Sequence, residues 1–366
     1  MKSRWIESTL KKADIQLDGD RPWDVKILNP KAIRDIALKG SLGAGESYVE
    51  GTWDVEKLDE AFYRLFEARL DGGIAASFPQ LIWKIKKFFM NPQSKGRAFQ
   101  VGEEHYDLDV DLFKNMLDSK MVYSCAYWRE SKNLEEAQEA KLDLVCKKMG
   151  LKPGMKVLDV GSGFGGFLIH AAKNYGIKGT GITVSKSQRD EASKRAQGLD
   201  IEFKLMDYRD LNGKWDRIVS IGQFEHVGSK NYSTYLQKMK QCLSEEGLML
   251  LHTIGNDKTY AGADPWMEKY IFPNGEIPSL TQMAKAFEET FIVEDLHNFG
   301  ADYDKTLMAW YDNFENTFPD KNSSFYRMWK YYLLTCAAAF RARRLELWQF
   351  VLSPNGVPGG YKRPCL

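Results

Sequence analysis

Apolar positions after residue 154 form short runs that alternate with segments of helical spacing. Five of these runs are rich in β-branched residues, which predicts strands: MKVLDV (155–160), IKGTGITV (177–184), IEFKLM (201–206), DRIVSI (216–221) and LMLLHTI (248–254). The intervening and later patterns predict helices at 186–196, 232–243, 279–289, 305–317 and 323–344, a strand at 291–297 and a final strand, LELWQFVLS. This alternation predicts an α/β fold with a doubly wound parallel sheet and right-handed crossovers.

The first 95 residues have a different pattern. Helical spacing of apolar residues appears at 31–38 and 54–70, and the glycine-rich stretch GSLGAGESYVEGTW separates the two segments. A polar segment at about 91–105, broken by Pro92 and Gly96, predicts a linker. We therefore predict a small, mainly helical N-terminal domain over 1–95 and a second domain over 96–366.

Composition excludes several classes of protein. Apolar residues make up 43% of the 366 residues and charged residues 28%, which is typical of a soluble globular protein. The formal net charge of +1 provides no global basic field, so we expect no nucleic-acid partner. Five cysteines without a C-x-x-C pair predict neither a metal site nor a disulfide framework. The charged first residues and the lack of a long apolar run predict a cytoplasmic protein without a signal peptide.

One local charge anomaly lies between residues 72 and 102, where the chain has no acidic residue. Within it, LIWKIKKFFM interleaves lysines with large apolar residues: Trp83, Lys84, Lys86, Lys87, Phe88 and Phe89. Such a mixture suits a surface that lies against an anionic bilayer. The alternative interpretation is an ordinary amphipathic helix whose lysines face solvent.

A glycine-rich loop follows the first predicted strand of the sheet, where Gly161-Ser162-Gly163-Phe164-Gly165-Gly166 leads into a helix. Glycines permit close approach of the backbone to a ligand, and the helix N-terminus offers free N–H groups. A dinucleotide site requires an acid about 20 residues later, but GTGITVSKSQ contains none. The spacing therefore favours S-adenosylmethionine, with Asp159 holding its ammonium, Asp207 accepting from its adenine amino group and Tyr208 covering the ring. A tight turn without a ligand is the structural alternative.

Polar residues also gather at the ends of predicted strands. YSCAYW (123–128) precedes the sheet, QFEHVG (223–228) supplies Glu225 and His226, LLHTIG (250–255) supplies His252, and NFGADYD (298–304) supplies Tyr303. Open α/β sheets bind ligands at the carboxyl ends of their strands, so we expect these four segments to form one site. A core histidine at a strand end is the alternative interpretation of His252.

At these residues the chain resembles the cyclopropane-fatty-acyl-phospholipid synthases and, more distantly, the mycolic acid cyclopropane synthases. The motifs that carry the resemblance are GSLGAGESYVEGTWD, EEHYDLDVDLF, YSCAYW, VLDVGSGFGGF, GITVSKSQ, DYRDL, DRIVSIGQFEHVG, DPWMEKYIFPNG, HNFGADYDKTLMAWY and FRARRLELWQFVLS. They span nearly the whole chain. The resemblance implies the fold of a class I S-adenosylmethionine-dependent methyltransferase, with a Rossmann-like, seven-stranded, doubly wound sheet and an added N-terminal domain.

The resemblance also implies a reaction. The methyl group of S-adenosylmethionine is transferred to a cis double bond of an acyl chain in a membrane phospholipid, and a bound bicarbonate ion deprotonates the carbocation so that a cyclopropane ring closes. The implied bicarbonate contacts are the backbone amides of Cys125 and Ile254 and the side chains of Glu225, His252 and Tyr303. Tyr303, Trp266 and Tyr270 are candidates for stabilising the cation through their aromatic faces.

Cys336 matches a cysteine that the family treats as an active-site residue. No step of this reaction requires a thiolate nucleophile, so we interpret Cys336 as part of the wall of an acyl pocket. The resemblance assigns binding of S-adenosylmethionine to Tyr123, Ser124, Gly161, Ser162, Gly163, Thr183, Val184, Ser185, Gln188, Tyr208, Arg209 and Ile221.

Partners and alternatives follow from the same resemblance. It implies a homodimer associated peripherally with the inner face of the membrane, with the N-terminal domain docking on the phospholipid bilayer. A related reaction on the same fold would methylate the double bond to a methyl-branched or methylene product. A protein of another class, a catalytically silent lipid-binding protein, would have no reason to retain the site for S-adenosylmethionine.

Overall fold

The computed structural model describes residues 2–70, 93, 110–260 and 263–364, which form two compact units. Unit 1 contains residues 1–91, 261–273 and 303–345, and unit 2 contains residues 92–260, 274–302 and 346–366. Unit 1 thus includes two segments that the sequence placed in the second domain. The predicted linker at 91–105 lies, apart from Gln93, outside the described residues, so the division of the chain near residue 95 stays a prediction.

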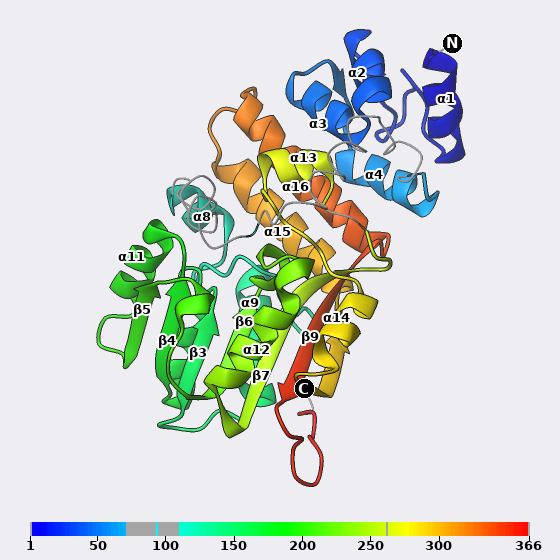
Figure 1. The fold of residues 1–366 in the computed structure, drawn as a ribbon. Helices are drawn as coiled ribbons and strands as arrows, with labels where there is room; N and C mark the ends of the chain where they lie inside the picture. Colours follow the sequence, from blue (N-terminus) through cyan, green and yellow to red (C-terminus); the bar gives the residue numbers. More distant parts are fainter. Residues whose placement is uncertain (1, 71–92, 94–109, 261–262, 365–366) are drawn as a thin grey trace. The chain divides into compact units, whose positions relative to one another are not determined.

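Unit 2 is built on a seven-stranded sheet in the order β5-β4-β3-β6-β7-β9-β8 (Figure 1). Pairing is parallel from β5 through β7, and β8 runs antiparallel to β9. The strands are β3 (Lys156–Val160), β4 (Lys178–Thr183), β5 (Ile201–Leu205), β6 (Trp215–Ile221), β7 (Leu243–Asn256), β8 (Ile292–Asn298) and β9 (Leu345–Ser353). Every strand predicted from the apolar runs is present, and the predicted doubly wound, seven-stranded α/β sheet is confirmed.

Helices cover both faces of this sheet. Leu158, Ile218 and Met249 lie in one buried cluster with apolar residues of α12 and α14, whereas their strand neighbours Val157 and Val219 lie in a second cluster with residues of α9, α10 and α11. Successive side chains of a strand point to opposite faces, so both faces need apolar residues. The bounds are α8 (Val110–Met116), α9 (Leu134–Lys148), α10 (Gly166–Tyr175), α11 (Lys186–Arg195), α12 (Tyr232–Cys242) and α14 (Leu280–Phe287), with 3₁₀ turns at 208–210, 224–226 and 229–231.

Unit 1 is mainly helical. Its helices are α1 (Lys2–Lys12), α2 (Lys31–Lys39), α3 (Ser41–Val49), α4 (Leu58–Glu67), α13 (Pro265–Tyr270), most of α15 (Ala301–Thr317) and α16 (Ser324–Arg341), and β1 (Lys26–Ile27) pairs with β2 (Trp53–Asp54). The glycine-rich separator expected between two helices is itself the helix α3. A Cβ at Gly43 would lie 2.1 Å from the Asp35 carbonyl oxygen, and one at Gly45 would lie 2.3 Å from the Trp266 ring. These glycines therefore permit close packing of α3 on α2 and α13.

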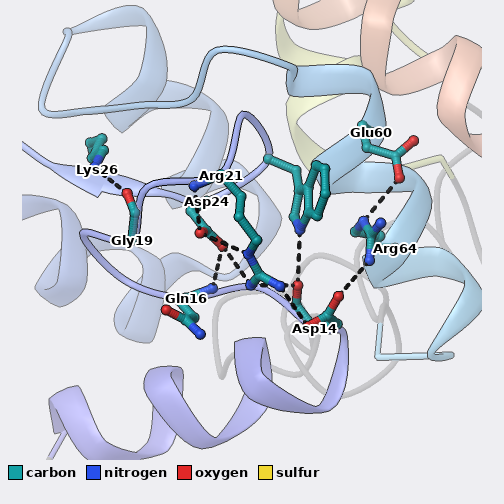
Figure 2. A network of polar contacts seen from close by, with 9 residues as sticks. Asp14, Gln16, Gly19, Arg21, Asp24, Lys26, Glu60 and Arg64 are labelled. Carbon is teal, nitrogen blue, oxygen red and sulfur yellow. Dashed lines mark hydrogen bonds and ion pairs between the residues drawn. The ribbon is translucent and has the colours of Figure 1, made fainter.

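Figure 2 shows the polar network that ties the segment after α1 to α4 within unit 1. The Arg21 guanidinium donates to Asp14 at 2.7 Å and to both oxygens of Asp24 at 2.8 and 3.0 Å, while Arg64 donates to the other Asp14 oxygen at 2.8 Å. Asp24 is buried and also accepts from the Gln16 backbone N–H at 2.8 Å. The bonds from Arg21 lower the pKa of Asp24 to about 2, so its carboxylate is a permanent anchor for this turn.

Candidate functional site

The glycine loop connects the carboxyl end of β3 to α10. Gly161 and Gly163 adopt φ angles of 82° and 51°, which side chains with a Cβ rarely adopt. The N–H groups of Gly161 and Ser162 both donate to the Ile182 carbonyl of β4, at 3.0 and 2.9 Å. A Cβ at Gly161 would lie 2.7 Å from Gln223, whereas one at Gly163 would meet no described atom within 4 Å. The loop is therefore anchored to the sheet on one side and open at Gly163.

Asp159 lies buried at the end of β3, just before this loop. Burial raises its pKa to about 7, and the nearby Lys141 ammonium opposes that shift. Within the described residues its Oδ1 atom has no hydrogen-bond partner. An unpartnered buried carboxyl is costly unless a ligand satisfies it, and a ligand ammonium would do so. The residue thus fits the role in S-adenosylmethionine binding that its position predicts.

The segment after β4 is braced by its own side chains. The Thr183 hydroxyl donates to Gln188 Oε1 at 2.9 Å and accepts from the Ser185 N–H at 3.2 Å. The Ser185 hydroxyl in turn caps α11 by accepting from the Gln188 N–H at 3.2 Å. Together with Val184, these predicted ligand-binding residues form one ordered turn beside the glycine loop of the neighbouring strand.

Asp207 and Tyr208, which were predicted to contact the adenine, both contact the side chain of Arg209. Asp207 accepts from the Arg209 N–H at 2.9 Å, and its carboxylate is 3.0 Å from the Arg209 guanidinium. The same guanidinium lies 4.5 Å from the centre of the Tyr208 ring and donates to the Gln93 carbonyl at 2.9 Å. The Tyr208 ring is buried, with its centre 4.8 Å from that of Tyr235. Arg209 therefore holds both residues that were predicted to contact the adenine.

Glu225 lies in the 3₁₀ turn that follows β6 and Ile221. Its Oε1 atom accepts from the Ile254 N–H of β7 at 2.7 Å, and its Oε2 atom has no hydrogen-bond partner in the described part of the chain. Burial raises the pKa of this carboxyl to about 7, and the Ile254 N–H and the nearby Thr253 hydroxyl oppose that rise. The Thr253 hydroxyl itself donates to the Ile254 carbonyl at 3.1 Å. The predicted contact of the Ile254 amide with bicarbonate would therefore compete with Glu225. His226, beside it, is only partly buried.

His252 lies on β7 opposite Ile221 of β6 and is almost wholly buried. Its Nδ1 atom is 3.1 Å from Gln349 Nε2, and within the described residues its Nε2 atom is unpartnered. Burial holds the pKa of this imidazole well below its usual value, and the Lys141 and Lys148 charges act in the same direction. His252 is therefore a neutral side chain with one ring nitrogen available to a ligand.

The segment 123–128 adjoins His252 through an aromatic contact. Phe299 lies 5.8 Å from the His252 ring and 5.4 Å from the Tyr127 ring, measured between centres. Cys125 is buried and its thiol donates to the Ala126 carbonyl at 3.2 Å, while Ser124 accepts from the buried Lys141 ammonium at 2.8 Å. Tyr123 packs edge-on against Phe113 at 5.2 Å. Within unit 2, the structure thus links this segment to the strand-end segments that supply His252 and Phe299.

Other predicted site residues belong to unit 1. Tyr303 on α15 is buried, with its ring centre 4.5 Å from that of Phe340, and Trp266 lies 4.6 Å from Tyr331 and 5.4 Å from Tyr270. Burial raises the pKa of the Cys336 thiol to about 12, so it remains protonated at neutral pH. A protonated thiol is a poor nucleophile, and the place of Cys336 in the wall of an acyl pocket stays a prediction. The participation of Tyr303, Trp266 and Tyr270 in one site with Glu225 stays a prediction.

Sequence reasoning missed several polar residues of unit 2. Lys141 and Lys148 are buried on the apolar face of α9, and Gln349 is buried on β9. The sequence offered one indication that the two lysines are buried. The buried positions 134, 137, 141, 144 and 148 recur at intervals of three or four, so lysines stand at 141 and 148 where helical spacing requires apolar residues. The described residues contain no group of three or more possible metal ligands. None of the helices described is long and apolar enough to cross a membrane.

The chain is similar to known proteins over most of its length. A family model described as mycolic acid cyclopropane synthetase matches residues 93–350. The cyclopropane-fatty-acyl-phospholipid synthase of Escherichia coli is 48% identical over 98% of this chain and 95% of its own length. A probable fatty acid methyltransferase of Pseudomonas putida is 38% identical over 71% of this chain and 70% of its own. A crystal structure of a mycolic acid cyclopropane synthase complexed with SAH and CTAB matches with a TM-score of 0.65 and 31% identity, covering 69% of this chain and 97% of that one.

The glycine loop provides a first prediction. Gly163→Val should abolish binding of S-adenosylmethionine, measured by calorimetry, because a branched side chain would fill the open side of the loop. Gly198→Val is the matched control, since Gly198 has a φ of 82° and equally open surroundings but lies outside the loop. Backbone strain alone would affect both variants. Wild-type affinity in a folded Gly163→Val protein would place the ligand elsewhere.

A second prediction concerns stability. The Glu225 pKa of about 7 exceeds its ordinary value of 4.5, so between these pH values the folded state binds more protons and stability falls as pH rises. The ionised Glu225 carboxyl destabilises the wild type at pH 8, and Glu225→Gln removes this effect. The gain in the free energy of unfolding of the variant over the wild type should therefore be larger at pH 8 than at pH 5, by up to about 3 kcal/mol. Urea unfolding at both pH values measures this difference. Glu245→Gln, an exposed position on β7, is the control and should show no such dependence.

Proposed function

The chain belongs to the cyclopropane synthase family of S-adenosylmethionine-dependent methyltransferases, and from this we propose that it acts on unsaturated acyl chains of membrane phospholipids. In the proposed reaction the sulfonium methyl group is transferred to a cis double bond. A proton is then removed from the added methyl group by bicarbonate, and the cyclopropane ring closes. The extent of the match to the Escherichia coli enzyme, 95% of its length, supports the phospholipid substrate.

The observation that carries the proposal is the pair of unsatisfied polar atoms at adjoining strand ends. Glu225 Oε2 and His252 Nε2 are both buried and unpartnered within the described residues, and the two residues are connected through the backbone of β7, where Ile254 donates to Glu225. One is a carboxyl oxygen and the other an imidazole nitrogen, so together they offer an acceptor and a donor. A bicarbonate ion carries both a hydroxyl and negatively charged oxygens, and it fits this pair.

Each residue would then have a separate task. His252, neutral and buried, would donate from Nε2 to an oxygen of the anion. Glu225 would accept from the hydroxyl of the anion and so orient a basic oxygen toward the substrate. Asp159 would hold the ammonium of S-adenosylmethionine beside the glycine loop. All three side chains are buried. Their burial would help to keep out water, which would otherwise capture a carbocation as an alcohol.

The direct test uses the intact protein with S-adenosylmethionine labelled in its methyl group and vesicles of unsaturated phospholipid. Mass spectrometry of the acyl chains, with position-resolved fragmentation, distinguishes a cyclopropane from a methyl-branched or methylene product. We expect a ring at the site of the original double bond. A branched or methylene product would favour the related fatty-acyl C-methyltransferase reaction. Binding of S-adenosylmethionine without any product would indicate a different acceptor.

Glu225→Gln should lower turnover by about 100-fold or more while leaving the affinity for S-adenosylmethionine unchanged. The substitution removes the oriented acceptor for the base but leaves Asp159 and the glycine loop intact. Removal of dissolved CO2 should also slow the wild-type enzyme, and added bicarbonate should restore it. Glu245→Gln is again the control, with wild-type turnover expected. Near-wild-type turnover in Glu225→Gln, or indifference to bicarbonate, would contradict the assignment.

We further propose peripheral docking on anionic membranes by the basic segment at 83–97, which, apart from Gln93, lies outside the described residues. The support is its sequence: Lys84, Lys86, Lys87, Lys95 and Arg97 occur beside Trp83, Phe88 and Phe89 in a stretch without acidic residues. Each basic residue near an anionic surface contributes about 1 kcal/mol, screened by salt. The implied homodimer remains an expectation of the same kind.

Replacement of Lys84, Lys86 and Lys87 by Glu should reduce sedimentation with anionic vesicles and reduce turnover, while binding of S-adenosylmethionine stays intact. The matched control replaces three exposed lysines of unit 2, Lys152, Lys178 and Lys194, by Glu. Equal loss of vesicle binding in both triple variants would indicate a non-specific charge effect. Unchanged vesicle binding in the first would show that the lysines face solvent and that the membrane contact lies elsewhere.

A further inference from the structure

We infer that Lys148 and Gln349 are positioning residues that hold His252 in the tautomer with its proton on Nε2. Neither residue has a role in the proposed reaction so far, and neither has a free polar atom directed at a ligand. The inference deepens the proposed function, because it explains how His252 can present a donor to an anion. It can be tested without the reaction.

The three side chains form a buried chain of contacts within unit 2. Gln349 lies on β9, next to β7 in the sheet, and its Nε2 atom is 3.1 Å from His252 Nδ1. Lys148, in the last turn of α9, donates from Nζ to Gln349 Oε1 at 2.9 Å. The exposed fractions are 1% for Lys148 and His252 and 0% for Gln349, so water does not compete for these hydrogen bonds.

Lysine determines the orientation of the glutamine amide. A lysine side chain offers hydrogens in its charged form, and the opposite amide orientation would place the NH2 group of Gln349 against the Lys148 nitrogen. In that orientation two donors would face each other in a buried site, at a cost of a lost hydrogen bond on each. The oxygen of Gln349 therefore faces Lys148, and its NH2 group faces His252 Nδ1.

The amide in turn determines the tautomer of the histidine. A neutral imidazole has one N–H donor and one acceptor nitrogen. Because Gln349 presents a donor, His252 Nδ1 must be the acceptor, and the proton then resides on Nε2. That is the nitrogen without a partner among the described residues. The atom directed away from Gln349 is consequently a donor, as an anion requires.

Lys148 is itself held from the other side. Its Nζ atom is 3.1 Å from His297 Nδ1 and 3.8 Å from an Asp295 carboxylate oxygen, and Asp295 accepts from Arg363 Nε at 2.7 Å. The Tyr361 hydroxyl donates to the Lys148 carbonyl at 3.0 Å. Burial lowers the pKa of Lys148 to about 7, but an amine retains N–H groups and can still donate to Gln349. The ammonium form fixes the amide orientation, because only a neutral amine has a lone pair that would accept from the NH2 group of Gln349 in the reversed orientation. The tautomer of His252 is therefore to be measured below pH 7.

The decisive measurement is the tautomer of His252 in the intact, ligand-free protein. Two-bond ¹H–¹⁵N spectra of histidine-labelled protein distinguish a protonated ring nitrogen from an unprotonated one, and the His252 signals are identified by their loss in His252→Gln. We expect an unprotonated Nδ1 and a protonated Nε2 in the wild type. The reverse tautomer, or an imidazolium near neutral pH, would overturn the inference.

Two substitutions at position 349 then separate orientation from packing. In Gln349→Glu, the carboxylate replaces the donor by an acceptor, so His252 should carry its proton on Nδ1 or on both nitrogens. In Gln349→Met the side chain keeps its length but loses the donor, so both tautomers should appear. We expect kcat to fall about 10–100-fold in both variants with the affinity for S-adenosylmethionine unchanged. Lys148→Met, which frees the amide to reverse, should again mix the tautomers.

The chain offers an internal control. Asn174 Nδ2 lies 3.1 Å from His170 Nδ1 within α10, which is the same kind of amide–imidazole contact. Asn174→Leu should alter the His170 signals alone and leave both the His252 tautomer and turnover unchanged. An unchanged His252 tautomer in all three variants at positions 148 and 349 would contradict the inference. If the tautomers change as expected while bicarbonate has no effect on turnover, the inference stands and the bicarbonate assignment fails.

Discussion

Burial of ionisable side chains at the carboxyl edge of the sheet is the constraint on which the site depends. Asp159, Glu225 and His252 are removed from water together with Lys141 and Lys148, and burial shifts the pKa of each toward its neutral form. Their mutual interactions offset part of this cost, since Lys141 favours the charged form of Asp159. The buried atoms without a hydrogen-bond partner in the described part of the chain include one each on Asp159, Glu225 and His252, and with these a ligand would recover hydrogen bonds. The burial of these polar atoms thus both lowers the stability of the ligand-free protein and would favour binding of a ligand.

The strand order determines where these groups meet. Connections run outward from β3 in one direction to β4 and β5 and in the other to β6 and β7, so the point at which the strand order reverses, where open α/β sheets bind ligands, lies between the ends of β3 and β6. Gly161 at the end of β3 lies against Gln223 after β6, which leaves no space for a Cβ. The pairing of β6 with β7 then places Ile221 opposite His252 and brings Ile254 within hydrogen-bond distance of Glu225. The proposed sites for the methyl donor and for an anion would therefore lie next to each other as a consequence of one topology.

The sequence predicted the sheet well because buried parallel strands require apolar residues on both faces, and such runs are conspicuous. It also located Asp159, Glu225 and His252, since strand ends can be read directly from the same runs. It did not identify α3, where Gly43 and Gly45 serve close packing against α2 and Trp266, because spacing alone does not reveal what lies opposite a glycine. Lys148 and Gln349 escaped for a related reason. Their contact joins residues 201 positions apart, and it depends on the pairing of β9 beside β7, which no local pattern encodes.

If the proposed reaction proceeds through a carbocation, a neutral amide between the lysine and the histidine has a particular advantage. A carboxylate at position 349 would favour an imidazolium, and a positive charge there would oppose a carbocation forming nearby. Direct contact of Lys148 with His252 would also fix Nδ1 as the acceptor, but it would bring the lysine charge closer to the reacting carbon. Gln349 accepts from Lys148 and donates to His252 Nδ1, and it carries no charge of its own. In the proposed reaction His252 would then donate to the anion while it remains neutral, so the negative charge of the anion would be left to balance the cation.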